Sequence, residues 1–257
     1  GNKNTAIGHA ALTTVTTGDD NTGIGFGALE LNTGLRNTAV GKSSLQSNTT
    51  ANDNTAVGTI SLNANTEGAG NTAVGKDSLA ANTTGGANVG IGCGALMANT
   101  TANSNVAVGE GSLKCNTTAT TNTAVGTFAL CANVTGAGLT SVGNGALRKN
   151  TGSNSTSVGN LSLACNTSGA SNTSIGAGAL TANTTAANNV AVGANALTAN
   201  TTGHSNVAMG ANALDANTEA NQNTAIGTDA LTTATTAGSN TAVGHDALGD
   251  TTTGGQN

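Results

Sequence analysis

The residues that could carry acid–base, nucleophilic or metal chemistry are few and scattered along the chain. There are three histidines, four cysteines and twelve acidic residues among 257 positions. His9 and His245 occupy the same place in a sequence repeat but lie fourteen copies apart, so we expect no Ser-His-Asp or Cys-His set to converge. We therefore predict no enzyme activity, no cofactor and no metal site.

The cysteines lack the spacing of metal ligands, and they fall at three different places in the repeat. Small hydrophobic residues that fill Ala-rich positions are the simplest interpretation of them. They are Cys93, Cys115, Cys131 and Cys165.

Recurring Asn-x-Ser/Thr motifs offer another chemistry, the attachment of N-linked glycans. The asparagine of each motif stands three residues after a leucine, once per repeat. We interpret this asparagine column mainly as a ladder of stacked amides that caps turns, and the functional alternative is that a secretory host attaches glycans along one edge in addition to that role. The motif asparagines are Asn48, Asn82, Asn99, Asn116, Asn133, Asn166, Asn183 and Asn200.

The composition argues against several partners. Only 7% of the residues are charged, the formal net charge is −5, and the chain has no Trp or Tyr and two Phe. A protein that binds nucleic acid would need a basic stripe or an aromatic platform. No apolar stretch is long enough to cross a bilayer, so we expect no membrane insertion.

The elements that position all these residues come from one repeated pentapeptide, Asn-Thr-Ala-Val-Gly. It begins with residues 4–8, ends with residues 240–244, and occurs in fifteen copies. Twelve of the fourteen intervals between copies have the same length, as from Gly8 to Gly25, and two are one residue shorter, as from Gly25 to Gly41. A period this regular indicates stacked, equivalent coils, so residues 1–257 form a single repeat array.

Each coil is expected to be all-β. Short alternations with β-branched residues predict two brief strands per coil, Thr-Ala-Val and Ala-Leu-x-Ala, closed by an Asn-Thr-Thr-Gly loop. We expect a parallel β-solenoid of about fifteen 17-residue coils, flattened into a two-sided β-roll in preference to a three-sided β-helix. A helical solenoid is disfavoured, because glycine at a fixed place leaves no run long enough to nucleate a helix.

Two columns of the repeat are expected to form the core: the aliphatic residue before the motif glycine and the leucine four residues after that glycine. The residue between the strand's threonine and its aliphatic residue is always Ala, Gly or Ser. If the strand alternates, this small residue faces outward and provides a packing face for a neighbouring chain, although it could also serve only to prevent clashes between coils. The packing face would consist of Ala39, Ala56, Ala73, Ala107, Ala124, Ala191 and their equivalents.

The run Asn-Thr-Ala-Val-Gly-x-x-Ala-Leu resembles the head repeats of trimeric autotransporter adhesins, which carry a Ser-Val-Ala-Ile-Gly-x-x-Ser/Ala motif. It is similar also to the Asn-Thr-Ala-Ile-Gly…Asn-Thr-Thr-Gly arrays of phage tail-fibre-like and bacterial surface proteins. The resemblance covers nearly the whole chain, although the adhesin heads have a shorter repeat. It implies a left-handed β-roll, association as a trimer, a place in a longer fibre, and a location outside the cell, on its surface or on a virion.

The sequence thus predicts a non-enzymatic structural or adhesive rod of an extracellular fibre, either a filament subunit, a surface adhesin or a phage-type tail fibre. Its expected partners are copies of itself, side by side as a trimer or end to end as a filament, together with surface glycans. One alternative is an ice-binding protein with a repetitive Thr/Asn face, which is disfavoured because the strand threonine is expected to face inward with the aliphatic residue. Another alternative is a passive adhesin head that binds a receptor or a glycan.

Overall fold

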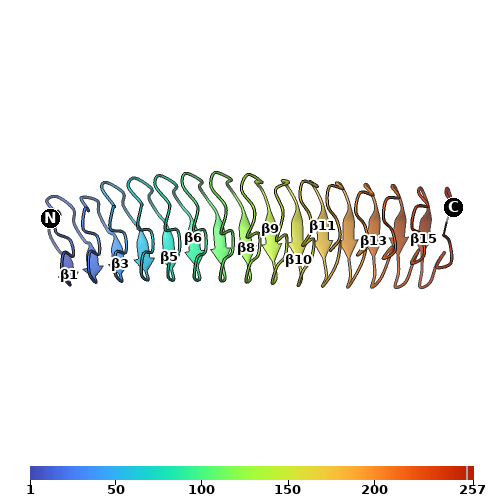
Figure 1. The fold of residues 1–257 in the computed structure, drawn as a ribbon, viewed down its shortest axis with the longest axis horizontal. Helices are drawn as coiled ribbons and strands as arrows, with labels where there is room; N and C mark the ends of the chain where they lie inside the picture. Colours follow the sequence, from blue (N-terminus) through green and yellow to red (C-terminus); the bar gives the residue numbers. More distant parts are fainter. Residues whose placement is uncertain (253) are drawn as a thin grey trace. The chain divides into compact units, whose positions relative to one another are not determined.

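The computed structural model describes residues 1–252 and 254–257, and it is an all-β parallel solenoid (Figure 1). It forms two compact units, Gly1–Thr135 and Gly136–Asn257. None of the described residues forms a helix, and so none provides an apolar helix of membrane-spanning length. Unit 1 contains β1 (Thr5–Ile7), β2 (Thr22–Ile24), β3 (Thr38–Val40), β4 (Thr55–Val57), β5 (Thr72–Val74), β6 (Val89–Ile91), β7 (Val106–Val108) and β8 (Thr123–Val125). Unit 2 contains β9 (Thr140–Val142), β10 (Thr156–Val158), β11 (Thr173–Ile175), β12 (Val190–Val192), β13 (Val207–Met209), β14 (Thr224–Ile226) and β15 (Thr241–Val243).

Within each unit, every strand pairs in parallel with the strand of the next coil, and equivalent residues lie opposite one another. Between β4 and β5, for example, Ala56 lies opposite Ala73 and Val57 lies opposite Val74. The two shorter intervals keep this register, because β2 pairs with β3, and β9 with β10, in the same way. The shortened loops therefore absorb the missing residue, and the predicted solenoid and its repeat length are confirmed.

In the part of the chain that the structure describes, the second strand predicted in each coil is absent, and the Ala-Leu-x-Ala segment is a turn. Its leucine has a left-handed backbone in every coil, as at Leu113 with φ 47°. A left-handed residue interrupts an extended chain, and this is why the segment cannot continue as a strand. The turn still joins neighbouring coils, because the Leu113 N–H donates to the Ala129 carbonyl at 3.0 Å and the Cys115 N–H donates to the Cys131 carbonyl at 3.0 Å.

The motif glycine ends each strand because no other residue fits there. Gly109 has φ 128°, and a Cβ added to it would lie 2.7 Å from the carbonyl carbon and oxygen of Gly126 in the next coil. Both the positive φ and the contact with the neighbouring backbone require glycine. The close stacking of coils therefore explains the fixed glycine of the repeat.

The leucine column is buried from Leu12 to Leu231, as predicted, and is exposed only in the last coil, at Leu248, but the orientation predicted for the strand is wrong. The small column, expected to face outward, has 0% exposure at all six alanines named for the packing face: Ala39, Ala56, Ala73, Ala107, Ala124 and Ala191. The reason is the width of the interior. Gly23 belongs to this column, and a Cβ there would lie 3.2 Å from Cγ of Leu12 in the preceding coil. Residues larger than Ser do not fit opposite the leucine column.

The aliphatic column, expected to lie in the core, faces outward instead. Its side chains are half-buried or exposed in every coil, with Ile91 39% exposed and Met209 43% exposed. The strand threonines lie on the same outer side. The predicted alternation of side chains along the strand is therefore confirmed, whereas the prediction that the threonine and the aliphatic residue face inward is wrong.

Candidate functional site: the outward strand face

The outer surface of the strands is the most regular surface of each unit. Two side chains per coil form it, the first and the last residue of each strand, and we call these two columns the strand face. The first residue is Thr in eleven coils and Val in four, and the last is Val or Ile in every coil except at Met209. Their burial is intermediate or exposed throughout, while the residue between them is buried in β2 to β15. A column of β-branched side chains thus remains open to solvent in both units.

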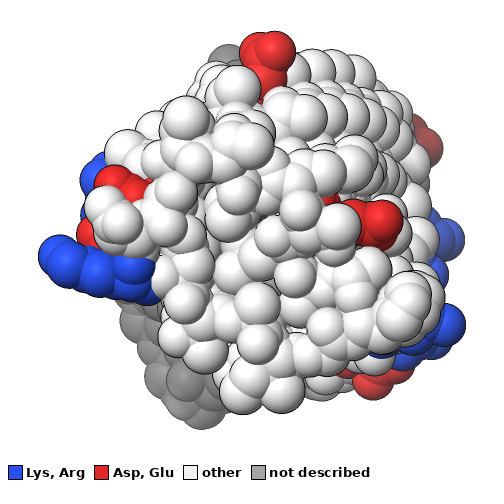
Figure 2. Space-filling view, turned by 90° about the vertical axis from the view of Figure 1, so that its left-hand side faces the viewer, with Lys and Arg blue, Asp and Glu red and all other residues white. Residues whose placement is uncertain are grey.

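The strand face carries no charge. Among the described residues, none of the Lys, Arg, Asp and Glu side chains belongs to a strand; all of them lie in the loops and turns. Figure 2, which looks at the molecule from the left-hand side of Figure 1, shows blue and red atoms in small separate groups with white surface between them. The repeat therefore separates an uncharged strand face from the loops and turns between the strands, which hold every charge of the described residues. We call these loops and turns together the loop edge.

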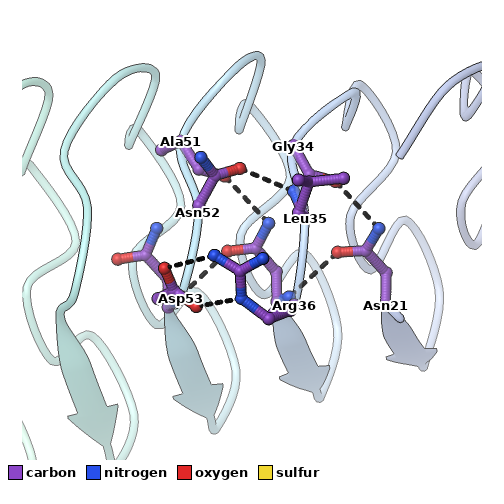
Figure 3. A network of polar contacts seen from close by, with 9 residues as sticks. Asn21, Gly34, Leu35, Arg36, Ala51, Asn52 and Asp53 are labelled. Atoms are coloured by element: carbon purple, nitrogen blue, oxygen red, sulfur yellow. Dashed lines mark hydrogen bonds and ion pairs between the residues drawn. The ribbon is translucent and has the colours of Figure 1, made fainter. Parts of the chain in front are cut away.

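Behind the strand face, the asparagine before each strand fixes the start of that strand. Asn54 accepts a hydrogen bond at Oδ1 from the N–H of Asn71 in the next coil (2.9 Å). Its amide nitrogen donates across the coil to the carbonyl of Gly68 (2.9 Å). Figure 3 shows the same contact between Asn21 and the Gly34 carbonyl, at 2.8 Å. Each of these buried asparagines ties its own loop to its strand and holds the next strand in register.

The second asparagine column, three residues after the leucine, forms an amide ladder. The amide nitrogen of Asn82 donates to Oδ1 of Asn65 in the preceding coil (2.8 Å) and to the Gly85 carbonyl of its own coil (2.9 Å). Asn71, of the first column, donates to the same Gly85 carbonyl at 2.8 Å. The buried asparagines are therefore hydrogen-bonded both along their column and to the loop carbonyl, which two amides share. Buried polar groups require such partners.

This ladder overturns the prediction of glycan attachment. A glycan would replace a hydrogen of the same amide nitrogen that donates within the interior, and it would need space outside the coil. All eight motif asparagines are fully buried: Asn48, Asn82, Asn99, Asn116, Asn133, Asn166, Asn183 and Asn200. The prediction of a glycosylated edge is therefore wrong for the folded chain, whereas the predicted amide ladder is confirmed.

Both asparagine columns have interruptions that the neighbours accommodate differently. In the first column Ser155 replaces asparagine, and its hydroxyl accepts from the N–H of Asn172 at 3.1 Å. In the second column Ala234 follows Asn217, and Oδ1 of Asn217 is the one buried side-chain polar atom without a hydrogen bond among the described residues. The alanine offers no donor at a place where the coils from Asn48 to Asn217 each have an asparagine.

The loop edge holds the charged contacts, which are exposed. The Arg36 guanidinium contacts Asp53 of the next coil through two hydrogen bonds of 2.6 and 2.9 Å, and the N–H of Leu35 donates to Oδ1 of Asn52 at 2.7 Å (Figure 3). The bond from Arg36 lowers the pKa of the Asp53 carboxyl, and the pKa of Arg36 is raised in turn. Exposed pairs of this kind contribute little to stability.

The cysteines lie in the turns that follow β6, β7, β8 and β10, and not in the core. Cys93 and Cys115 are exposed, and Cys131 and Cys165 are half-buried. Their interpretation as hydrophobic fillers is therefore wrong for the first two. Cysteine is accommodated at these two places because solvent, and not a packed wall, lies beside the side chain.

No protein-family model matches this chain, and no curated protein matches it. The resemblance to adhesin heads and tail-fibre arrays therefore rests on the repeat motif itself. Sequence reasoning missed the strand face as a site because it assigned the aliphatic column to the core. The signal that could have found it is the size limit on the residue between its two columns, which is never larger than Ser, as a narrow interior requires.

Proposed function

We propose that the chain is a non-enzymatic structural module of an extracellular fibre, carried on a cell surface or a virion, and that copies of it associate side by side through the strand face. The observation that carries the proposal is the column of outward aliphatic side chains, which is present in every coil and uncharged throughout. Exposed apolar surface of this extent marks interaction sites.

A second copy of the chain is the occupant that fits this face. Most side chains on it are Thr, Val or Ile, so the face offers methyl groups and hydroxyls but no group that would select a charged partner. Copies bring the same uncharged columns to one another at the same strand spacing, so their side chains can interdigitate without burying a charge. The resemblance to trimeric adhesin heads favours three copies.

The proposed mechanism is mechanical. Within each unit, the coils are joined along the strands, the leucine turns and both asparagine columns, so a force applied to one coil is shared by several rows of hydrogen bonds. The variable loop residues would then provide contacts to surfaces, including surface glycans. End-to-end association into a filament is the alternative arrangement of the same module.

The strand face can be tested by placing a charge on it. Val125→Lys puts an ammonium group on the outer side of β8, and Thr127→Lys puts the same group in the loop of the same coil. We expect the parent chain and Thr127→Lys to have a mass that is a multiple of 24.3 kDa by light scattering, and Val125→Lys to be monomeric. Circular dichroism would check that both variants are folded.

Two results would contradict this proposal. One is a stable parent monomer at micromolar concentration with no fibres in electron micrographs. The other is equal assembly of Val125→Lys and the parent, which would mean that another surface, such as the coil ends, makes the contact.

Ice binding is a second candidate because the strand threonines lie on the outer face, although no Thr-x-Thr pair recurs on it. The strand threonines were expected to face the interior. In β2, β3, β4, β5 and β8 they are instead half-exposed, and they lie in one in-register column. Regularly spaced methyl and hydroxyl groups on an uncharged face are suited to ordering water. The two candidates use the same face, so a chain whose strand face is covered by other copies cannot bind ice with it.

A nanolitre osmometer separates the candidates. Ice binding predicts faceted crystals and thermal hysteresis that Thr123→Lys removes and Thr127→Lys preserves. Rounded crystals that grow without hysteresis from the parent chain and from Thr127→Lys would exclude ice binding by the strand face as it stands and leave the assembly proposal standing.

A further inference from the structure

Three side chains with metal-binding chemistry meet at one corner of unit 2. They are Asp229, in the loop after β14, and His245 and Asp246, in the loop after β15. One ligand atom from each lies within 4.8 Å of the other two. The two loops stack because the N–H of Asp246 donates to the carbonyl of Thr228 at 3.1 Å, so equivalent corner residues of successive coils are neighbours. Spacing along the chain does not reveal the cluster, since the three residues belong to two different coils.

The distances within the cluster suit one metal ion. Nδ1 of His245 and Oδ2 of Asp246 are 2.9 Å apart. Two ligand atoms bound at about 2.1 Å to the same zinc ion are about 3 to 3.5 Å apart, so this pair can bind one ion with little movement. His245 and Asp246 are exposed and Asp229 is half-buried, so rotation of their side chains can close the remaining gap.

A neighbouring amide orients the third ligand. Oδ1 of Asp229 accepts a hydrogen bond from the amide nitrogen of Asn212 in the preceding coil, at 3.0 Å. Ligands of metal sites are commonly held by such outer contacts. This hydrogen bond uses Oδ1 and not Oδ2 of the Asp229 carboxylate.

The charge of this part of the chain also favours a cation. Residues 150–257 contain five acidic residues and no Lys or Arg, so the chain supplies no cationic side chain of that type to its last coils. The pKa of the Asp215 carboxyl is raised above its ordinary value, first by burial and also by repulsion from the negative charge of the nearby Asp229. Stacked like charges on neighbouring coils are unfavourable unless a cation lies between them.

We propose that Asp229, His245 and Asp246 bind one divalent transition-metal ion. One imidazole nitrogen with two carboxylate oxygens is a donor set for zinc and its neighbours in the first transition row, whereas calcium and magnesium prefer oxygen ligands alone. The ion links the corner after β14 to the corner after β15, and it therefore acts as a clip between two coils of unit 2.

The test uses the full chain with its four cysteines changed to serine, so that thiols do not bind the metal. After removal of metals with a chelator, the chain is dialysed against zinc chloride and its zinc content is measured by mass spectrometry. We expect one zinc ion per chain, and at least about tenfold weaker binding in Asp229→Asn and in His245→Gln. His204→Gln is the matched control, because His204 is an exposed histidine on another loop and its removal should leave zinc binding unchanged.

A second readout is the unfolding temperature. Zinc should raise it in the parent and in His204→Gln but not in Asp229→Asn or His245→Gln, because a ligand stabilises only the fold that binds it. The proposal is overturned if no zinc is bound at millimolar zinc chloride, or if zinc is bound equally well by both cluster variants.

Discussion

The interior of the coils and the outer face of their strands reverse the usual division of residue types. Inside, two asparagines in most coils are fully buried beside one leucine and small residues, and outside, a threonine or valine and a second aliphatic residue face the solvent. A typical protein core is built from large aliphatic side chains, and asparagine lies mainly on the surface.

The difference shows that the two regions are stabilised by different means. The narrow interior depends on hydrogen bonds that repeat from coil to coil, as between Asn65 and Asn82, and on small residues opposite each leucine. The strand face buries its aliphatic residues only in part within one chain, so a contact outside the chain would explain their regularity further. Substitutions on the two sides of one strand should therefore have opposite consequences.

The largest effect is expected from a charge placed inside. Ala124→Arg puts a guanidinium into a column with no exposure, where it cannot be paired, and the loss of stability should exceed about 4 kcal/mol. Its neighbour Val125→Arg points outward and should remain folded. Denaturant unfolding followed by circular dichroism measures both, and comparable losses in the two variants would contradict the assigned orientation.

A smaller but still large effect is expected from a cavity in the leucine column. Leu113→Ala removes a fully buried side chain and should cost about 2–5 kcal/mol. Leu31→Ala is a fitting control, because Leu31 is exposed in the loop edge and its loss should be nearly neutral. The midpoints of urea unfolding give the comparison, which fails if Leu31→Ala is as costly as Leu113→Ala.

The amide ladder should contribute less per residue than the leucine column. Asn82→Ala leaves Oδ1 of Asn65 without its donor, and an unsatisfied buried group costs about 1–3 kcal/mol. Asn144→Ala changes the same residue type at an exposed loop position and should be close to neutral. Equal unfolding midpoints for the two variants would show that the ladder does not hold the interior together.

The smallest predicted effect is a gain in stability. Ala234→Asn supplies a donor to Oδ1 of Asn217 and continues the ladder by one coil, which should stabilise unit 2 by about 1 kcal/mol. Ala199→Asn is the control, since that residue lies outside the asparagine column. A thermal unfolding scan should show a higher midpoint for Ala234→Asn alone, and a lower one would mean that the interior cannot hold another amide there.

Much of the fold was predictable because it follows from the repeat. The period determined the coil length, the motif glycine marked the end of each strand, and the two shortened intervals marked a loop. The buried leucine column and the amide ladder also follow from residues that hardly vary. These features depend on stacking equivalent residues, which a strict period specifies directly.

The orientation of the strand could not be predicted in the same way. A three-residue alternation such as Thr-Ala-Val fits either side of a strand, and hydrophobicity favours placing Val inside. The deciding factor is the distance across the coil, where the leucine of the preceding coil meets the small residue. The turn that replaces the second strand was missed for a related reason, because leucine rarely adopts a left-handed backbone and nothing in its side chain signals one.

Thiol labelling tests the reversed interior most directly. In a chain whose four cysteines are changed to serine and whose assembly is blocked by Val57→Lys, cysteine is introduced either as Ala107→Cys or as Val108→Cys, two neighbours on β7. The structure predicts that a thiol reagent modifies the outward Val108→Cys within minutes under native conditions, while Ala107→Cys reacts only after unfolding. Rapid native labelling of Ala107→Cys together with protection of Val108→Cys would contradict the account.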